Sequence, residues 1–329
     1  MDYLRGMSSS VVPAPSAVPT GAATPVAPMP AAAARTSGSG IGGTDALLVL
    51  MALIWGGNFF AVQYGAAHMD AWAFNAARMT LGLVVLVVLA LATVRVPWPS
   101  RADTLRLLGC GVIGNGIYQL LFIGGVPRTR GGSASLILAA SPAVLALIGW
   151  LTRTEKLTRQ LLVGVACSIA GVAMVMLGDQ AHPSRPGSML GNVLVAAACL
   201  TWGVYATLLR PLAARLNGLH VTVITLIGGV VPLVALAVPS LLRTPWTTLD
   251  TGTWGAIAYA GVGAMGLAYV IYYRGLAQLG PTRTSMYGNL QPFIALLVAW
   301  QLQHDAPTVA QLLGAAGILG GIVLARRAS

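Results

Sequence analysis

Ten long apolar segments, separated by short polar connections, follow one another between residues 45 and 325 of this chain. The hydrocarbon core of a bilayer is about 30 Å thick, and an α-helix needs roughly 20 apolar residues to cross it. Each segment has about that length, so each is predicted to span a membrane. The predicted spans are residues 45–67, 71–94, 104–126, 130–151, 159–178, 188–209, 219–242, 251–273, 281–302 and 307–325.

The composition agrees with a membrane protein. Hydrophobic residues make up 56% of the chain and charged residues 8%, with a mean hydropathy of +0.78, which does not suit a soluble domain that needs a charged surface. The net charge of +11 does not indicate nucleic-acid binding, because the basic residues lie singly between apolar segments instead of on one face. We expect the lipid bilayer as a partner, and no nucleic acid.

Residues 1–43 differ from the rest of the chain, since Ala, Pro, Ser, Gly and Thr dominate them. This composition is typical of a disordered tail, and it lacks the compact apolar stretch of a cleaved secretory signal.

The three cysteines, Cys110, Cys167 and Cys199, lie in apolar runs without the spacing of a disulfide or a metal site. No metal and no cofactor are expected.

The basic residues between the predicted spans are distributed unequally. Short cytoplasmic loops carry an excess of Lys and Arg. One side of the membrane receives Arg5, Arg35, Arg95, Arg101, Arg106, Arg153, Lys156, Arg159, Arg210, Arg215, Arg274, Arg283, Arg326 and Arg327; the other receives only Arg128, Arg130, Arg185 and Arg243. The asymmetry predicts that both termini are cytoplasmic, and it supports a count of ten spans because a miscounted helix would scramble the alternation.

The two halves of the chain resemble each other. An offset of 150 residues aligns residues 111–172 with 261–322 without a gap. The matched pairs include Ser135 with Ser285, Pro142 with Pro292, Trp150 with Trp300 and Glu155 with Asp305, and an offset of 147 places Trp55 and Gly56 on Trp202 and Gly203. Chance similarity between apolar helices is the alternative, but matched Trp, Pro and acidic positions in one register argue against it.

Five spans per half is an odd number, so the second half enters the membrane upside down relative to the first. Inverted repeats of this kind are typical of transporters, because the halves can exchange conformations and expose a central site to either side. The predicted fold is an all-α polytopic membrane protein of ten helices in two inverted five-helix repeats, residues 44–178 and 188–325.

Arg78 is the one charged residue inside a predicted span, roughly 12 Å below the outer end of the second helix by helical rise. One interpretation is a cavity arginine that binds a substrate carboxylate. The other is a structural arginine that bonds helix-end carbonyls or reaches outward to the interface. The 147-residue offset pairs it with Thr225, so the charge breaks the symmetry of the halves.

Several polar and aromatic residues share helix faces near mid-membrane, where polar groups are costly unless they face protein, water or ligand. Spacing of i, i+3 and i+4 places such side chains together, either as cavity lining or as helix packing. With Arg78, the candidate substrate-binding residues are Trp55, Asn58, Phe59, Asn115, Tyr118, Gln119, Trp202, Tyr205, Tyr269, Tyr287, Asn289 and Gln291. Pro142 and Pro292 interrupt backbone bonding near mid-span, and kinking alone is the simpler interpretation.

Small residues at four-residue spacing occur in the fifth and tenth predicted spans, at Cys167 and Gly171 and at Gly317 and Gly321. Such spacing permits close helix contact. Packing within one chain and dimerisation are both compatible with it, so we expect a monomer or a weak homodimer.

These motifs together resemble the ten-helix EamA branch of the drug/metabolite transporter superfamily. The resemblance covers residues 45–325, and it rests on LIWGGNFFAVQY in the first span, on Arg78, and on the segments that begin SPAVLALIGW and QPFIALLVAW. Asp305 stands where this family more usually has Glu. Within the family, the chain is most similar to the YddG-type exporters of aromatic and other amino acids, which implies export of small metabolites.

The positions of the acidic residues and the absence of catalytic motifs limit the possible mechanisms of transport. The eight acids fall in tails, loops or helix ends, so a proton relay through a deep carboxylate is not supported and facilitated movement down a gradient is expected. No catalytic motif and no nucleotide-binding loop is present, so the chain is not expected to be an enzyme. The expected substrate is a neutral or zwitterionic metabolite, amino acids foremost, at a bacterial-type plasma (inner) membrane. The alternatives are another metabolite or drug, or a non-transporting receptor or scaffold.

Overall fold

The computed structural model describes residues 42–152, 158–180, 188–304 and 306–326, and within these ranges every regular element is a helix. Most of the predicted tail, and the pair Glu155 and Asp305, lie outside the described residues. The elements of the first half are α1 (Gly43–His68), α2 (Ala71–Thr93), α3 (Arg101–Gly111), η1 (Val112–Ile117), α4 (Tyr118–Gly125), η2 (Val126–Arg128), α5 (Gly131–Ala139), α6 (Ser141–Leu151) and α7 (Arg159–Gln180).

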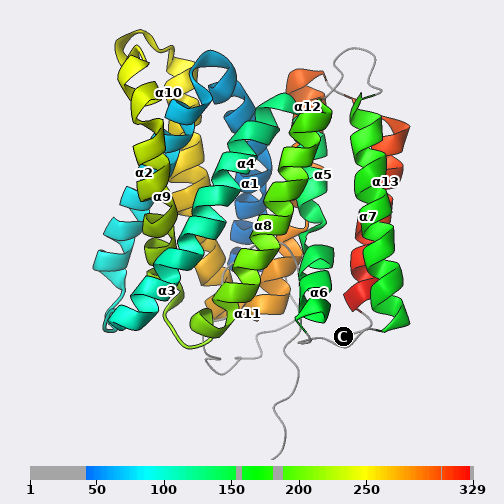
Figure 1. Ribbon diagram of the computed structural model, residues 1–329, viewed down its shortest axis with the longest axis horizontal. Coiled ribbons are helices and arrows are strands. Elements are labelled where there is room, and N and C mark those ends of the chain that lie inside the picture. Colours follow the sequence, from blue (N-terminus) through cyan, green and yellow to red (C-terminus); the bar gives the residue numbers. More distant parts are fainter. Residues whose placement is uncertain (1–41, 153–157, 181–187, 305, 327–329) are drawn as a thin grey trace, which may run out of the picture.

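The second half repeats this order of long and interrupted helices. Its elements are α8 (Met189–Ala213), α9 (Gly218–Arg243), η3 (Trp246–Thr248), α10 (Thr251–Ala258), η4 (Tyr259–Leu267), α11 (Ala268–Gly288), α12 (Gln291–Gln303) and α13 (Val309–Arg326). Successive long helices run in opposite directions across the bundle, and α13 ends at its lower edge (Figure 1). The backbone of α11 leaves helical geometry at Gly280, where φ is 78°.

Eight helices of the described chain are long and apolar enough to cross a membrane. They overlap the first eight predicted spans, from Gly43–His68 to Thr251–Gly280. The ninth predicted span, 281–302, falls on the end of α11 and on α12, and the tenth falls on α13, whose apolar part Val309–Leu324 is shorter. The chain is therefore a polytopic helical membrane protein, whereas the count of ten spans stays a prediction.

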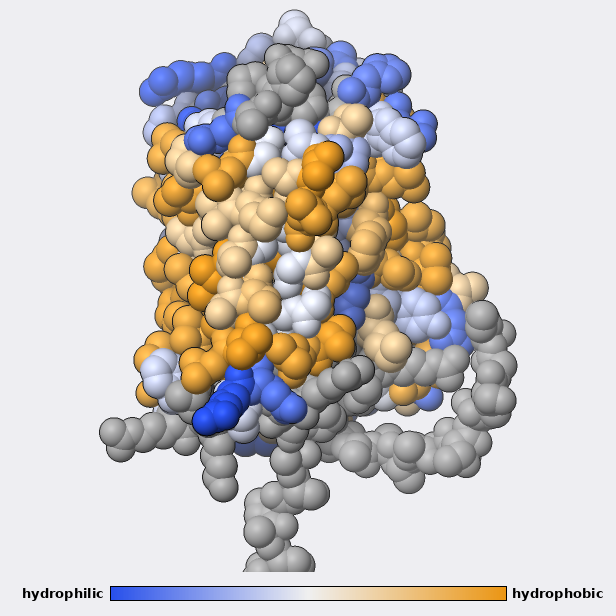
Figure 2. All heavy atoms as spheres, turned by 90° about the vertical axis from the view of Figure 1, so that its right-hand side faces the viewer, coloured by the Kyte–Doolittle hydropathy of each residue, from blue (hydrophilic) through white to orange (hydrophobic). Residues whose placement is uncertain are grey.

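A broad apolar band covers one face of the bundle. Figure 2 shows it on the face that contains α7 and α13, with hydrophilic residues above and below. Large apolar side chains on these two helices point outward, among them Ile169, Leu177 and Leu313, which are 59%, 61% and 55% exposed. An exposed apolar surface of this extent suits contact with lipid tails and not with water.

Short polar side chains set the starts of several helices. The carboxylate of Asp70 accepts hydrogen bonds from the backbone N–H groups of Trp72 and Ala73 at the start of α2. Ser100, Ser188, Asn217 and Asp250 do the same at the starts of α3, α8, α9 and α10. These caps satisfy backbone donors that have no partner inside the helix, which explains why the spans begin where they do.

Close helix contacts occur in pairs that the sequence offsets relate. A Cβ added to Gly56 of α1 would lie 2.5 Å from Cγ2 of Ile294 in α12, and one added to Gly203 of α8 would lie 2.6 Å from Cγ1 of Val144 in α6. The 147-residue offset relates the two glycines, and the 150-residue offset relates Val144 to Ile294. The contact between α1 and α12 therefore has a counterpart between α8 and α6.

The irregular backbone is also matched between the halves. The π-helical segments η1 and η4 overlap under the 150-residue offset, which carries Val112–Ile117 onto 262–267. The break between α5 and α6 at Ala140 corresponds to the break between α11 and α12 at Leu290. A proline follows each break and lacks the backbone N–H that would bond four residues back. Both pairs of irregularities lie where the helices pass the centre of the bundle.

The predicted small-residue contact forms within the chain, between α7 and α13. A Cβ on Gly171 would lie 2.6 Å from the carbonyl oxygen of Gly314, and a Cβ on Gly314 would lie 2.6 Å from that of Gly171. Gly321 makes an equally close approach to Gly164. The two helices stand side by side at one edge of the bundle (Figure 1), and only glycine permits their spacing at these positions.

A buried polar network joins four helices at the end of the bundle where α7 ends. The Asp179 carboxylate accepts hydrogen bonds from Ser133 (2.7 Å) and Thr129 (2.9 Å), and its Oδ1 lies 4.0 Å from Nε of Arg130. Thr129 also bonds Asn192 of α8, and Arg130 donates to Gln311 of α13 at 3.1 Å. Asp179 was predicted at a helix end, and it is there, but it is fully buried and not in solvent.

Candidate functional site

A cavity of about 190 Å³ lies at the centre of the bundle, between residues from both halves. Its lining comes from α1, α2, η1, α4, α5, α6, α8, η4, α11, α12 and α13. Because both matched helix breaks and both π-helical segments contribute to it, the cavity sits where the helices are least regular. Irregular backbone at membrane depth is tolerated where it lines such a cavity.

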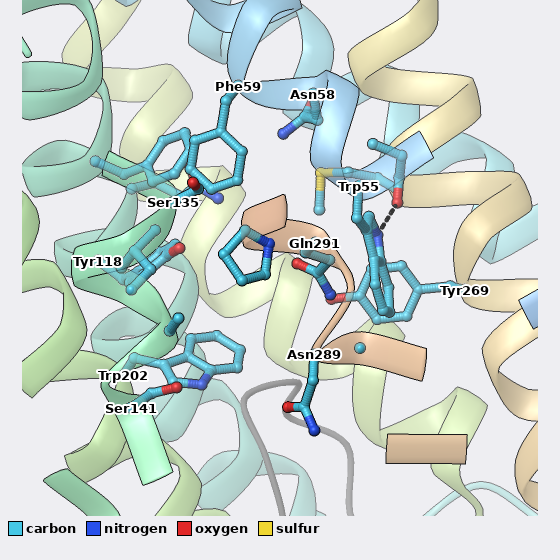
Figure 3. A pocket seen from close by; sticks show the side chains of 18 of the residues that line it. Trp55, Asn58, Phe59, Tyr118, Ser135, Ser141, Trp202, Tyr269, Asn289 and Gln291 are labelled. Atoms are coloured by element: carbon cyan, nitrogen blue, oxygen red, sulfur yellow. Dashed lines mark hydrogen bonds between the residues drawn. The ribbon is translucent and has the colours of Figure 1, made fainter. Parts of the chain in front are cut away.

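Eleven of the thirteen candidate residues line this cavity. They are Trp55, Asn58, Phe59, Arg78, Asn115, Tyr118, Gln119, Trp202, Tyr269, Asn289 and Gln291. Figure 3 shows Trp55 and Tyr269 on one side of the space and Tyr118 and Trp202 across from them. The side chains that share a helix face in the sequence thus converge on one space.

The two other candidates lie outside the cavity lining. The ring of Tyr205 fills the space that Gly114 of η1 leaves by having no side chain, and its hydroxyl donates to Oγ1 of Thr225 at 3.3 Å. The hydroxyl of Tyr287 donates to Asp45 at 2.6 Å, at the start of α1. In the structure each hydroxyl is directed at a neighbouring helix, where it has a hydrogen-bond partner.

Aromatic rings form two walls of the cavity. Tyr118 packs against Trp202 with ring centroids 5.2 Å apart and against Phe122 at 5.7 Å. On the other side, Trp55 meets Tyr269 edge to face at 5.7 Å. Such rings offer apolar faces that suit an aromatic or large apolar group of a ligand.

The indole of Trp55 is fixed by the π-helical backbone of η4. Its Nε1 donates a hydrogen bond of 2.9 Å to the carbonyl oxygen of Ala264. A π-helical turn displaces carbonyl groups from the usual helical ladder, and Trp55 binds one of them. This bond connects the two halves beside the cavity.

Arg78 is 2% exposed and has only neutral partners among the described residues. One of its terminal nitrogens donates to Oδ1 of Asn75 at 2.7 Å and to Oε1 of Gln119 at 2.8 Å. The guanidinium lies 6.0 Å from the ring centre of Phe74 and 5.7 Å from that of Phe122. These contacts hold the cation in place, and it is the one charged side chain in the lining.

Four buried polar atoms of the lining have no hydrogen-bond partner within the described chain. They are Oδ1 of Asn58, Nε of Arg78, Oγ of Ser141 and Nε2 of Gln291. An unpaired buried polar group costs about 1–3 kcal/mol, so native proteins rarely keep one without a ligand or water to satisfy it. The cavity therefore presents both acceptors and donors to an occupant.

Some lining residues were not predicted from the sequence. They include Ser135, Leu138, Ala139, Ser141, Ala264, Met265, Gly288, Leu319 and Ile322. Ser141 had a usable signal, because the 150-residue offset pairs it with the candidate Gln291 directly before the matched prolines. The others are small or apolar, and nothing in their identity separates them from ordinary helix packing. Among the described residues, no group of His, Cys, Asp and Glu is arranged to hold a metal ion.

Comparison with known proteins agrees with this architecture. A protein of Streptantibioticus cattleyicolor, named probable terminal-alkyne amino-acid exporter, is 27% identical over 85% of this chain and 92% of its own length. A probable amino-acid metabolite efflux pump of Salmonella typhimurium is 27% identical over 84% of this chain and 93% of its own. A solved crystal structure superposes with a TM-score of 0.58 at 21% identity, over 86% of this chain and 96% of that one.

The family comparison covers both halves. The EamA-like transporter family matches residues 43–177 and again residues 189–327. The two matched segments comprise most of the chain, and they carry the resemblance that the sequence motifs indicated. This chain belongs to the EamA-like transporter family.

Proposed function

We propose that this membrane transporter exports neutral amino acids, aromatic ones among them, from the cytoplasm. The observation that carries the proposal is the central cavity, which combines aromatic walls, one fixed cation and unpaired polar atoms of both kinds. An amino acid offers an apolar side chain, an anionic group and a hydrogen-bond donor to match them. The names of the two relatives, an amino-acid exporter and an amino-acid metabolite efflux pump, support the same substrate class.

The proposed mechanism is alternating access by two inverted repeats. The paired contacts of Gly56 and Gly203, the matched π-helical segments and the two family matches support a common plan for the halves. If each half can adopt the conformation of the other, the cavity opens first to one side of the membrane and then to the other. We place both termini in the cytoplasm and the protein in the plasma membrane, on the strength of the unequal loop charges.

We further propose that transport is facilitative. No acidic residue of the described chain lines the cavity, and the buried carboxylate of Asp179 lies outside it, beside Arg130. A carboxylate that carries a coupling proton would have to exchange it with the cavity. In this arrangement the substrate gradient alone drives the flux.

Flux in proteoliposomes tests the proposal. Purified protein is reconstituted, and exchange of radiolabelled L-phenylalanine is measured against a panel of unlabelled amino acids, amines, sugars and nucleosides. We expect neutral amino acids to compete and the other classes to fail. If no unlabelled amino acid competes with the exchange, the proposed substrate class is wrong. Accumulation driven by an imposed pH gradient would contradict facilitative transport. The absence of flux for every panel member would favour a receptor or scaffold.

A further inference from the structure

Two helices begin inside the bundle at positions that the repeat relates. The helix α6 begins at Ser141 after the break at Ala140, and α12 begins at Gln291 after the break at Leu290. The 150-residue offset places Ser141 on Gln291, and a proline follows each. Both residues line the central cavity.

The two helix starts face the centre of the bundle from opposite sides. In Figure 1, α6 runs from the centre to the lower end and α12 from the centre to the upper end. The first turn of a helix carries backbone N–H groups without partners in the helix and a partial positive charge of about half a unit. At these two starts Pro142 and Pro292 have no N–H. The N–H groups of Ala143 and Ile294 donate to Ala140 and Leu290, so the free donors for an anionic group come from the first side chains.

The first side chain of each helix adds a free polar atom. Ser141 is 2% exposed, and its Oγ has no partner in the described chain; the same is true of the buried Nε2 of Gln291. Both atoms can donate a hydrogen bond. Figure 3 shows the two side chains in the wall of the cavity, close to Trp202 and to Tyr269 respectively. They provide two donors for an acceptor that the protein itself does not supply.

Arg78 alone does not meet this need. Its Nη2 is held by Asn75 and Gln119, while Nε is buried without a partner and Nη1 has no hydrogen bond within the described chain. The guanidinium therefore cannot turn its two-nitrogen face to a carboxylate without giving up those bonds. It contributes positive potential to the cavity, while the donors at the helix starts are unoccupied.

We propose that the starts of α6 and α12 form the carboxylate-binding site of the cavity, with Ser141 Oγ and Gln291 Nε2 as its side-chain donors. The inference deepens the proposed function and rests on it for the identity of the substrate. The ammonium group of the same substrate then lies toward Oδ1 of Asn58, an unpaired acceptor of the lining. The aromatic walls receive the side chain.

Binding of three related probes to purified protein tests the site. The probes are L-phenylalanine, 3-phenylpropionate, which keeps only the carboxylate, and 2-phenylethylamine, which keeps only the ammonium group. Affinities are measured by calorimetry for the wild type, Ser141→Ala and Gln291→Leu. We expect each substitution to weaken binding of the two carboxylate ligands at least about tenfold, as loss of one hydrogen bond to a charged group predicts, and to leave the affinity for 2-phenylethylamine unchanged.

Ser135→Ala is the matched control. Ser135 also lines the cavity and is 3% exposed, but its Oγ already donates to the carbonyl oxygen of Gly132 at 2.7 Å. Its removal takes no free donor from the cavity, so the affinity for all three probes should stay at the wild-type value. The thermal stability of each variant shows that the fold is retained.

The outcomes separate the site from the transport function. Wild-type affinity for the carboxylate probes in both Ser141→Ala and Gln291→Leu overturns the site, and so does an equal loss for all three probes, which indicates a packing effect. No binding of 3-phenylpropionate by the wild type overturns it as well. If the wild type moves no amino acid in proteoliposomes yet binds 3-phenylpropionate through Ser141 and Gln291, the substrate class fails and the anion site stands.

Discussion

At the scale of single residues, Arg78 combines a role in the fold with a place in the cavity lining. The sequence left open whether this arginine binds substrate or serves the fold. In the structure, Arg78 donates hydrogen bonds to Asn75 and to Gln119 of α4, and it also lines the cavity. Substitution by alanine would remove both roles and leave two buried amide oxygens without a donor, so that variant cannot separate them.

Arg78→Gln is the more informative variant, because glutamine removes the charge and keeps an amide donor for one of the two oxygens. We expect flux of L-phenylalanine in proteoliposomes to fall about tenfold, as loss of one charged contact predicts, with the protein still folded.

Asn58→Ala should reduce flux as well, since it removes an unpaired acceptor of the lining. Normal flux in either variant would remove that residue from the binding site.

The buried pair of Arg130 and Asp179 leads to a second prediction. Breaking a buried ion pair by removing one charge costs about 3 kcal/mol or more, because the other charge stays buried without compensation. Asp179→Asn should therefore lower the melting temperature of the purified protein markedly. The double variant Arg130→Gln with Asp179→Asn should recover part of the loss.

The pair of Arg215 and Asp103 is the comparison, since its arginine side chain is 49% exposed although that of Asp103 is only 11% exposed. Ion pairs that reach the surface contribute less than buried ones, so Asp103→Asn should lower the melting temperature less than Asp179→Asn does. A similar melting temperature for Asp179→Asn and Asp103→Asn would contradict the importance of the buried network.

At the scale of elements, the contact between α7 and α13 depends on glycine at specific positions. Gly314→Leu places a large side chain where Gly171 leaves room for no more than a hydrogen atom, so it should force the helices apart and lower the melting temperature by several degrees. Gly320→Leu on the same helix meets nothing within 4 Å and should be neutral. Equal stability of the two variants would contradict the contact.

The elements also show what the sequence can and cannot predict. The lengths of the apolar segments located the first eight spans within a few residues, because bilayer thickness fixes helix length. Pro142 and Pro292 located the helix breaks. The π-helical turns η1 and η4 had no signal, since nothing in VIGNGI or YAGVGAMGL separates them from an α-helix.

Pairings between distant residues were equally out of reach. Arg130 and Asp179 are both near predicted helix ends, and only the packing of α5 against α7 brings them together and buries them. Tyr205 does lie beside Trp202, with ring centroids 5.1 Å apart, but its ring fills the space beside Gly114 and is not part of the cavity lining. Periodicity along one helix states which residues share a face, not which neighbour that face meets.

At the scale of the whole molecule, the orientation in the membrane can be tested directly. Cys110, Cys167 and Cys199 are first replaced by alanine, and single cysteines are introduced at Val96, between α2 and α3, and at Thr247, between α9 and α10. Both positions are exposed in the structure. A membrane-impermeant maleimide applied to intact cells should label Thr247→Cys and not Val96→Cys, and the reverse pattern would invert the proposed topology.

The position of Arg78 also has an electrical consequence. Among the described residues the cavity lining carries one positive charge and no negative one, and a zwitterion leaves that sum unchanged when it binds. The empty and the loaded protein then respond equally to the membrane potential. Transport of neutral amino acids should accordingly give no steady current on a solid-supported membrane. A monoanion such as 3-phenylpropionate would instead cancel the charge of the arginine. The loaded protein would then change conformation independently of voltage, whereas the return of the empty protein would depend on it.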